Sequence, residues 1–233
     1  MMIRKKTEIT IINFRHLLLN FIVMPIFVFA QEKDANLWLG AGLSKDLSKK
    51  VSVSLEEGLR IKNNVRTLDQ VFTDIGIKYD LSKWLKIAAG YKFSQKHSQG
   101  EPISLGNRYN LDLILRHKTD FYTLGFRSRY QSTYSDIFVS ENWQLPKSSV
   151  RNKLQFDYVI INTPYRPSCY VEIYNDIKNR KFTLPVKYRL NIGMTYLINK
   201  EQAIDIFYML EQEVNVSYPV SNHIMGINWS LEL

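Results

Sequence analysis

The sequence of 233 residues contains one cysteine, Cys169, and four histidines. A single cysteine excludes an internal disulfide framework and any zinc site built from cysteines. His97, His117 and His223, the histidines beyond residue 30, have no spacing typical of a metal site. We therefore expect no metal site and no cofactor, and we interpret Cys169 as a small apolar side chain.

Long apolar runs are also missing after residue 30, which excludes membrane-spanning helices from that part of the chain. The one uncharged run, 17–30, follows a basic stretch, is broken by Pro25 and ends in Val28 and Ala30, two small residues at cleavage positions. This pattern predicts a secretory signal peptide over 1–30. The alternative, a membrane anchor, needs a longer run of ~20 residues. The remaining residues, 31–233, are predicted to form a single domain.

The sequence has no cluster of basic residues, although Lys plus Arg number 31 against 22 Asp plus Glu and give a net charge of +9. An evenly spread excess of this kind does not form a nucleic-acid-binding patch, so we expect no nucleic-acid partner. Hydrophobic residues make up 45% of the chain and charged residues 23%, which argues against wholesale disorder.

What the sequence does contain is strict alternation of apolar and polar residues. In 109–116, for example, Tyr109, Leu111 and Leu113 share one face, and Asn110 and Asp112 share the other. Period two over eight to ten residues predicts strands with one apolar face. The alternation is strongest in 85–94, 109–116, 122–131 and 188–196, and weaker in 36–44, 51–61, 69–79, 150–159, 168–177, 203–211 and 223–233.

The strand count is unusual for a bacterial barrel. These windows number eleven, whereas single-chain bacterial barrels have even strand numbers. Either 36–44 is not a full strand or one strand escapes the pattern, so we predict ten to twelve. Short links near 80–83, 118–120 and 199–202 alternate with longer links at 95–107, 132–149, 178–186 and 212–222.

Alternation does not decide whether the apolar face points inward, as in a soluble sandwich or lipocalin, or outward against lipid. The predicted signal peptide and strands of about 9–11 residues favour the membrane. Eight of the ten glycines fall on the polar face, where they suit a crowded lumen. We therefore predict an all-β, antiparallel, up-and-down transmembrane β-barrel.

Aromatic residues lie toward both ends of the predicted strands. Interfacial aromatics form two girdles in membrane barrels, whereas β-propensity alone explains the number of tyrosines but not their placement. The expected girdle beside the short links contains Tyr79, Trp84, Tyr122, Tyr158 and Tyr196, and the one beside the long links contains Tyr91, Tyr109, Tyr130, Tyr188 and Tyr208.

Glu57 does not fit the pattern, because it falls on the apolar face between Leu55 and Leu59. A carboxylate against hydrocarbon is unfavourable. We expect either a β-bulge at Glu56–Glu57 or a position near the rim of the barrel.

Charged residues gather on the polar face of the predicted strands. Pairing through the 118–120 link places 116 near 122 and 112 near 126, which brings Asp112 within reach of Arg127. We predict that opposite charges pair across a narrow lumen and largely fill it. The alternative is a narrow path for a solute or ion. The residues expected to constrict the lumen are Asp112, Arg116, Arg127, Arg129 and Arg189.

Motifs for catalysis are absent from the sequence. His97 and Ser98 are adjacent on an extended chain and therefore point to opposite sides, which is unsuitable for a nucleophile and its base. The 132–149 link contains Tyr134, Phe138 and Trp143, which could bind a partner or fold over the barrel mouth. We expect no enzymatic activity.

The sequence resembles an uncharacterised family, called domain of unknown function 2490, of predicted Gram-negative outer-membrane β-barrels. The resemblance spans most of 35–233 and implies location and fold, with no catalytic residues to carry over. The residues that carry it are Trp38, Glu56, Arg60, the 79–85 turn (YDLSKWL), Gly90-Tyr91-Lys92, Arg151-Asn152-Lys153 and the 188–193 segment (YRLNIG).

The sequence thus predicts a non-enzymatic protein of the cell outer membrane, delivered there after cleavage near Ala30. Its expected partners are outer-membrane lipid and, during biogenesis, the barrel assembly machinery. It would act as a narrow channel or a docking barrel. The alternative is a soluble periplasmic β-barrel that binds a lipid or a small apolar ligand.

Overall fold

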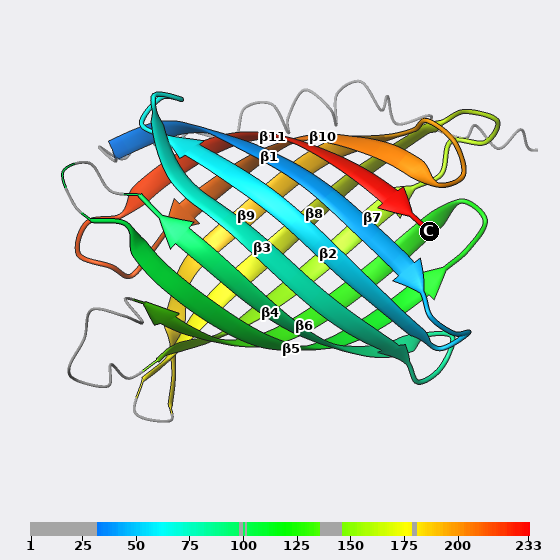
Figure 1. Ribbon diagram of the computed structural model, residues 1–233, viewed down its shortest axis with the longest axis horizontal. Helices are drawn as coiled ribbons and strands as arrows, with labels where there is room; N and C mark the ends of the chain where they lie inside the picture. Colours follow the sequence, from blue (N-terminus) through cyan, green and yellow to red (C-terminus); the bar gives the residue numbers. More distant parts are fainter. Residues whose placement is uncertain (1–31, 98–99, 101, 136–145, 179–180) are drawn as a thin grey trace, which may run out of the picture. The chain divides into compact units, whose positions relative to one another are not determined.

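The computed structural model describes residues 32–97, 100, 102–135, 146–178 and 181–233, so the predicted signal peptide lies outside the described residues (Figure 1). No helix in these ranges is long and apolar enough to cross a membrane. Eleven strands account for most of the described residues: β1 Glu32–Asp46, β2 Val51–Lys62, β3 Thr67–Asp80, β4 Leu85–Lys96, β5 Ser104–Lys118, β6 Tyr122–Ser135, β7 Lys147–Tyr158, β8 Tyr165–Lys178, β9 Lys181–Leu197, β10 Gln202–Glu213 and β11 Val220–Glu232.

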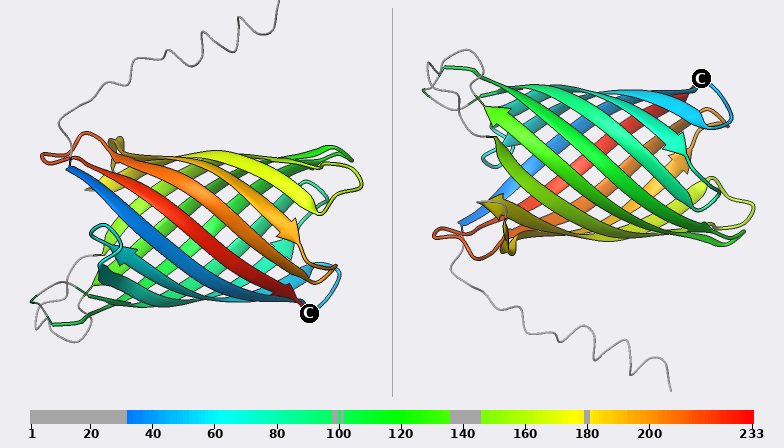
Figure 2. Two further views of the ribbon diagram at one scale, coloured as in Figure 1. Left: turned by 90° about the horizontal axis from the view of Figure 1, so that it is seen from above. Right: turned by 90° about the horizontal axis from the view of Figure 1, so that it is seen from below.

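The strands form a closed barrel in which each strand pairs with its neighbours in chain order. Ten of the pairings are antiparallel, and β1 pairs with β11 in parallel (Figure 2). Trp38 lies beside Gly226 in this parallel ladder. The all-β, up-and-down fold is confirmed, and so is a strand number between ten and twelve. The expectation of an even number is wrong: with eleven strands the first and last run in the same direction, and a parallel ladder closes the wall.

The strands are longer than the sequence windows. They contain 12 to 17 residues instead of 9–11. The predicted long link at 178–186 is wrong, because β8 continues to Lys178 and β9 already begins at Lys181. Polar residues continue the wall at the end opposite the short turns, and apolar alternation does not mark them as strand.

The apolar face points outward around the barrel. Leu111, Ile192 and Met225 are 62–64% exposed, whereas Asn110 and Asp112, which alternate with Leu111, are buried inside the lumen. An apolar surface that surrounds a whole barrel is stable against lipid rather than water. The barrel is therefore of the transmembrane type. The alternative, a soluble barrel that binds an apolar ligand, requires the opposite arrangement of faces.

Glu57 lies on the outer face near the middle of β2, neither at the rim nor in a bulge. The β2–β3 register runs without interruption through Glu56 and Glu57 and shifts only between Arg60 and Ile61. Both expectations for Glu57 are therefore wrong. The Thr73 hydroxyl on β3 donates a hydrogen bond to the Glu57 carboxylate at 2.8 Å, which satisfies part of its hydrogen-bonding capacity outside the lumen.

Small residues on the inner face make room for large ones. A Cβ added at Gly58 would collide with the Phe72 ring, and one added at Gly226 would collide with the Phe207 ring. Glycine is therefore needed at both positions for close approach rather than for an unusual backbone conformation. The Phe72 and Phe207 rings therefore lie directly against the inner face of the wall at these two glycines.

Candidate functional site in the barrel lumen

A row of stacked cations and aromatic rings begins on the inner faces of β1 to β4. The Lys92 ammonium lies 3.2 Å from the Phe72 ring centroid, and the Arg60 guanidinium lies 5.1 Å from the same ring. Arg60 also lies 4.0 Å from the Trp38 ring centroid. Contacts of this kind are favourable, and they hold long side chains in place away from bulk water.

The row continues on the other side of the β1–β11 seam. Arg189 on β9 lies 5.3 Å from the Trp38 ring and 4.9 Å from the Tyr174 ring on β8. Arg151 on β7 lies 4.6 Å from Tyr174. Because β10 and β11 separate β1 from β9 in the wall, the Trp38–Arg189 contact is made across the lumen. We call this row the cation–aromatic belt: Lys92, Phe72, Arg60, Trp38, Arg189, Tyr174 and Arg151.

Glu172 on β8 is the carboxylate with the most partners in this layer. It is 1% exposed and accepts hydrogen bonds from Arg127 and Arg151, each at 2.8 Å, and from the Tyr174 hydroxyl at 2.9 Å. Arg189 lies 3.5 Å from the same carboxylate. A buried carboxylate is stable only with such compensation, so Glu172 fixes the cations around it.

Asp112 pairs with Arg129, which donates two hydrogen bonds of 2.7 Å to the two carboxylate oxygens. The predicted partner was Arg127, and that prediction is wrong. The β5–β6 register places Asp112 opposite Arg129 and Arg116 opposite Gly125, three residues from the predicted pairing. The pair nearest the turn is Lys118 opposite Thr123, and this pair sets the register of the rest of the hairpin.

Two further carboxylates complete the layer. Asp74 on β3 pairs with Arg108 at 3.1 Å and with Lys92 at 3.4 Å. Glu211 on β10 accepts hydrogen bonds from Arg189 at 2.6 Å and from Lys187 at 2.9 Å. The ion pairs therefore link strands on several sides of the lumen to the belt.

The structure brings together four of the five residues predicted to constrict the lumen. Asp112, Arg127, Arg129 and Arg189 lie in this layer, whereas Arg116 lies near the 119–121 turn and makes no ion pair within the described part of the chain. The predicted strands began one residue too late to include Arg108 and Lys187, and continuing the same alternation by that residue would have found both. Arg151 and Glu211 lie within the predicted strands but were not among the residues expected to constrict the lumen.

The residues of the two expected aromatic girdles lie at two different heights of the barrel. Tyr79, Tyr122, Tyr158 and Tyr196 lie at or next to strand ends beside the short turns, and Trp84 lies in one of those turns. The other row lies within the strands because the strands extend beyond it. Its members are Tyr91, Tyr109, Tyr130, Tyr188 and Tyr208.

This second row gives the height of the charged layer. Tyr91 precedes Lys92, Tyr109 follows Arg108, and Tyr130 follows Arg129 in the sequence. Tyr188 likewise precedes Arg189. The belt and its ion pairs therefore lie level with this second tyrosine row. The strands continue beyond them, away from the short turns. Of the aromatic residues predicted in the 132–149 link, Tyr134 belongs to β6, and Phe138 and Trp143 lie outside the described residues.

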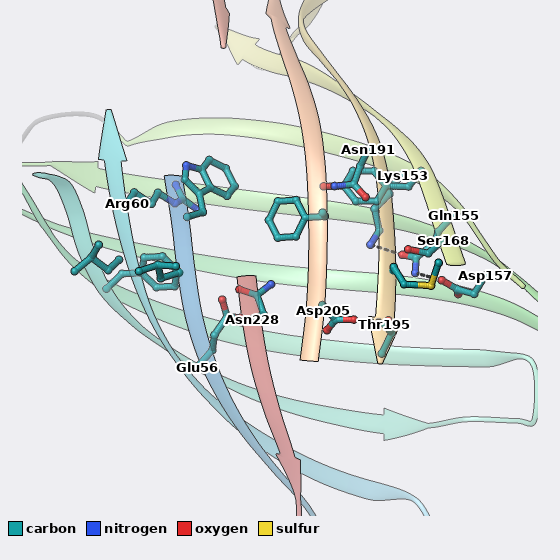
Figure 3. Close-up of a pocket in the computed structure, with 17 residues that line it drawn as sticks. Glu56, Arg60, Lys153, Gln155, Asp157, Ser168, Asn191, Thr195, Asp205 and Asn228 are labelled. Carbon is teal, nitrogen blue, oxygen red and sulfur yellow. Dashed lines mark hydrogen bonds between the residues drawn. The ribbon is translucent and has the colours of Figure 1, made fainter. Parts of the chain in front are cut away.

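Cavities occupy the lumen between the belt and the short-turn end. One cavity of about 430 Å³ lies on the short-turn side of the belt and is lined by Trp38 and Arg60 among other residues. Figure 3 shows it in close-up. In that view Arg60 and Glu56 lie on the opposite side from Lys153 and Asp157, and Gln155 joins the latter two by hydrogen bonds. A second cavity of about 550 Å³ lies on the β2–β6 side, and a third of about 310 Å³ lies beside Arg116.

Comparison with known families identifies the chain. The family model with the description "Protein of unknown function (DUF2490)" matches residues 35–220. The chain belongs to this family. The match runs from β1 to the first residue of β11 and therefore includes every residue of the belt in the DUF2490 barrel. The resemblance seen in the sequence is confirmed. No curated protein matches the chain.

Three solved structures are similar to the DUF2490 barrel at low sequence identity. The translocator domain of the autotransporter NalP from Neisseria meningitidis has a TM-score of 0.46 at 9% identity, over 77% of this chain and 73% of that one. The KdgM porin in complex with disordered oligogalacturonate has a TM-score of 0.45 at 13% identity, over 81% and 92%. The β-domain of the Bordetella autotransporter BrkA has a TM-score of 0.42 at 9% identity, over 77% and 78%. They assign no solute or partner to this chain.

Metal binding finds no geometric support in the described ranges, where no group of three or more His, Cys, Asp or Glu side chains could hold an ion. His223 lies on the outer face, where its Nδ1 is 2.6 Å from the Tyr208 hydroxyl. Cys169 is exposed on the same face. The chemistry that the lumen offers is therefore that of charge pairing and hydrogen bonding.

Proposed function

We propose that this protein is a non-enzymatic outer-membrane β-barrel whose lumen is closed by the cation–aromatic belt. The observation that carries the proposal is the contact of Trp38 with both Arg60 and Arg189, at 4.0 and 5.3 Å, because it links side chains of β2 and β9 through a residue of β1. Side chains fill the interior of eight-stranded barrels and leave a channel in porins of 16–18 strands, so eleven strands enclose a narrow interior that large side chains can span. Ion pairs around Glu172 fix the belt in place.

The proposed location is the outer membrane, reached after cleavage of the predicted signal peptide near Ala30 and insertion by the barrel assembly machinery. Lipid is the partner of the outer face. Short turns face the periplasm in barrels of this class. The cavities between the belt and the short turns would then open toward the periplasm. The strand ends on the other side of the belt would project from the cell surface.

We assign the protein no catalytic residues. The arginines and carboxylates of the charged layer pair with one another, and His117 and His223 lie outside that layer. A reaction would require a nucleophile or a general base that faces a substrate space.

Planar-bilayer recording tests the closed lumen. The wild-type barrel is expected to show little or no conductance, and the double variant Trp38→Ala/Arg60→Ala to conduct, because it removes two large side chains without leaving a carboxylate unpaired. Trp84→Ala, in a short turn on the outside, is the matched control and should not conduct. A large, stable conductance of the wild-type barrel would refute the proposal and make the belt a selectivity constriction.

A further inference from the structure

We propose that the cavity of about 550 Å³ below the belt is a binding site for a small polyanion that carries carboxylate or phosphate groups. We call this cavity the basic chamber. Its volume lies in the range of small-molecule sites. The inference goes beyond the proposed closed lumen, since a chamber with one open end binds a solute without passing it on.

The wall of the basic chamber carries an excess of positive charge. Eight Lys and Arg side chains line it, against the carboxylates of Glu56, Asp74 and Asp112. Glu172 and Glu211, which do not line the chamber, pair with three of these cations and leave an excess of three. Cations gathered in a space of low dielectric repel one another and attract anions more strongly than in water. An anionic solute would therefore relieve the repulsion among the cations that these carboxylates leave uncompensated.

Individual pairings explain the excess. Asp112 is engaged by Arg129, and Asp74 is shared by Arg108 and Lys92. Arg60 has no carboxylate partner among the described residues and donates its one side-chain hydrogen bond to Gln70, at 3.2 Å. Arginine is the side chain best suited to bind carboxylates and phosphates through paired hydrogen bonds.

Lys78 adds a cation at the open end of the chamber. It lies on β3 close to the short-turn end, is exposed, and has no ion pair within the described part of the chain. Ser44 and Ser52 line the same end and can donate hydrogen bonds to an anion. A solute can therefore enter past Lys78 and meet the arginines of the belt.

The neighbouring cavity of about 430 Å³ differs in charge. Its wall contains Arg60 and Lys153 against the carboxylates of Glu56, Asp157 and Asp205. Asp205 there accepts a hydrogen bond from Thr195. The positive excess of the chamber on the β2–β6 side is thus not shared by this neighbouring cavity.

Titration calorimetry on the purified full-length barrel in detergent tests the site at constant ionic strength. The probes are citrate for carboxylates and pyrophosphate for phosphates, with sucrose as an uncharged control. Saturable binding of citrate, pyrophosphate or both is expected. Which of them binds shows whether the site accepts carboxylate groups, phosphate groups or both. Lys78→Gln should weaken binding about fivefold, and Ser54→Glu, which adds a carboxylate to the wall, should weaken it more.

Lys86→Gln is the matched control, because Lys86 faces the lumen but pairs with Asp80 at 2.6 Å and does not line the chamber. It should bind like the wild type. The proposal is overturned if neither anion binds, if sucrose binds equally well, or if Lys86→Gln weakens binding as much as Lys78→Gln. Binding by a barrel that conducts would refute the closed lumen alone, and no binding by a barrel that does not conduct would refute the chamber alone.

Discussion

At the scale of single residues, Glu172 concentrates the electrostatics of the lumen. One buried carboxylate accepts hydrogen bonds from two arginines and a tyrosine, and it holds Arg151 and Tyr174 of the belt in position. Its negative charge is needed because the cations around it have few other counterions. Removal of one partner from a buried ion pair usually costs more than the pair contributes, since the charge that remains is still buried.

Glu172→Ala should therefore lower the free energy of unfolding by about 3–5 kcal/mol. The measurement is chemical unfolding of the barrel in lipid vesicles, followed by tryptophan fluorescence. Glu232→Ala, at the exposed end of β11, is the control and should change little. If the two variants unfolded at the same denaturant concentration, the network around Glu172 would not stabilise the barrel.

Arg127 and Arg129 illustrate how far a sequence can predict such a site. Alternation places both on the polar face with Asp112, and both lie in the charged layer. Their partners depend on features that alternation does not encode. A shift of three residues in the β5–β6 register changes the partner of Asp112, and the curvature of the wall brings Arg127 to Glu172 across the intervening strand β7.

At the scale of strands, β11 holds the two ends of the barrel together. It pairs with β10 in antiparallel and with β1 in parallel, and Met225, Ile227 and Trp229 lie on its outer face. Loss of this strand would leave unpaired backbone groups of β1 and β10 in lipid, where no water can satisfy them.

Deletion of 225–233 should therefore abolish insertion into the membrane. Expression of the truncated and the full-length chain, followed by protease treatment of isolated membranes, measures insertion directly. The double substitution Ser221→Ala/Ser230→Ala keeps the strand and should insert normally. Assembly of the truncated chain into a protease-resistant barrel would contradict the role given to the β1–β11 seam.

Strand positions were predictable for a simple reason, and strand ends were not. Apolar side chains facing lipid alternate with polar ones, so each of the eleven windows overlaps one strand. Beyond the tyrosine row that contains Tyr91 and Tyr188, on the side away from the short turns, polar residues follow one another on both faces of the strands. The pattern there no longer separates strand from loop. Backbone pairing with neighbouring strands extends the wall there.

At the scale of the whole molecule, the barrel has its apolar side chains outside and its charges inside. This arrangement makes lipid the natural surroundings of the outer face and allows charge pairing to replace an apolar core.

The most direct test of the account is fractionation of cells that express the full chain, with electrophoresis of heated and unheated samples. We predict that the protein sediments with the outer membrane, resists extraction with alkaline carbonate, and migrates differently before and after boiling. A protein recovered in the periplasmic fraction, with identical migration in both samples, would contradict the transmembrane barrel.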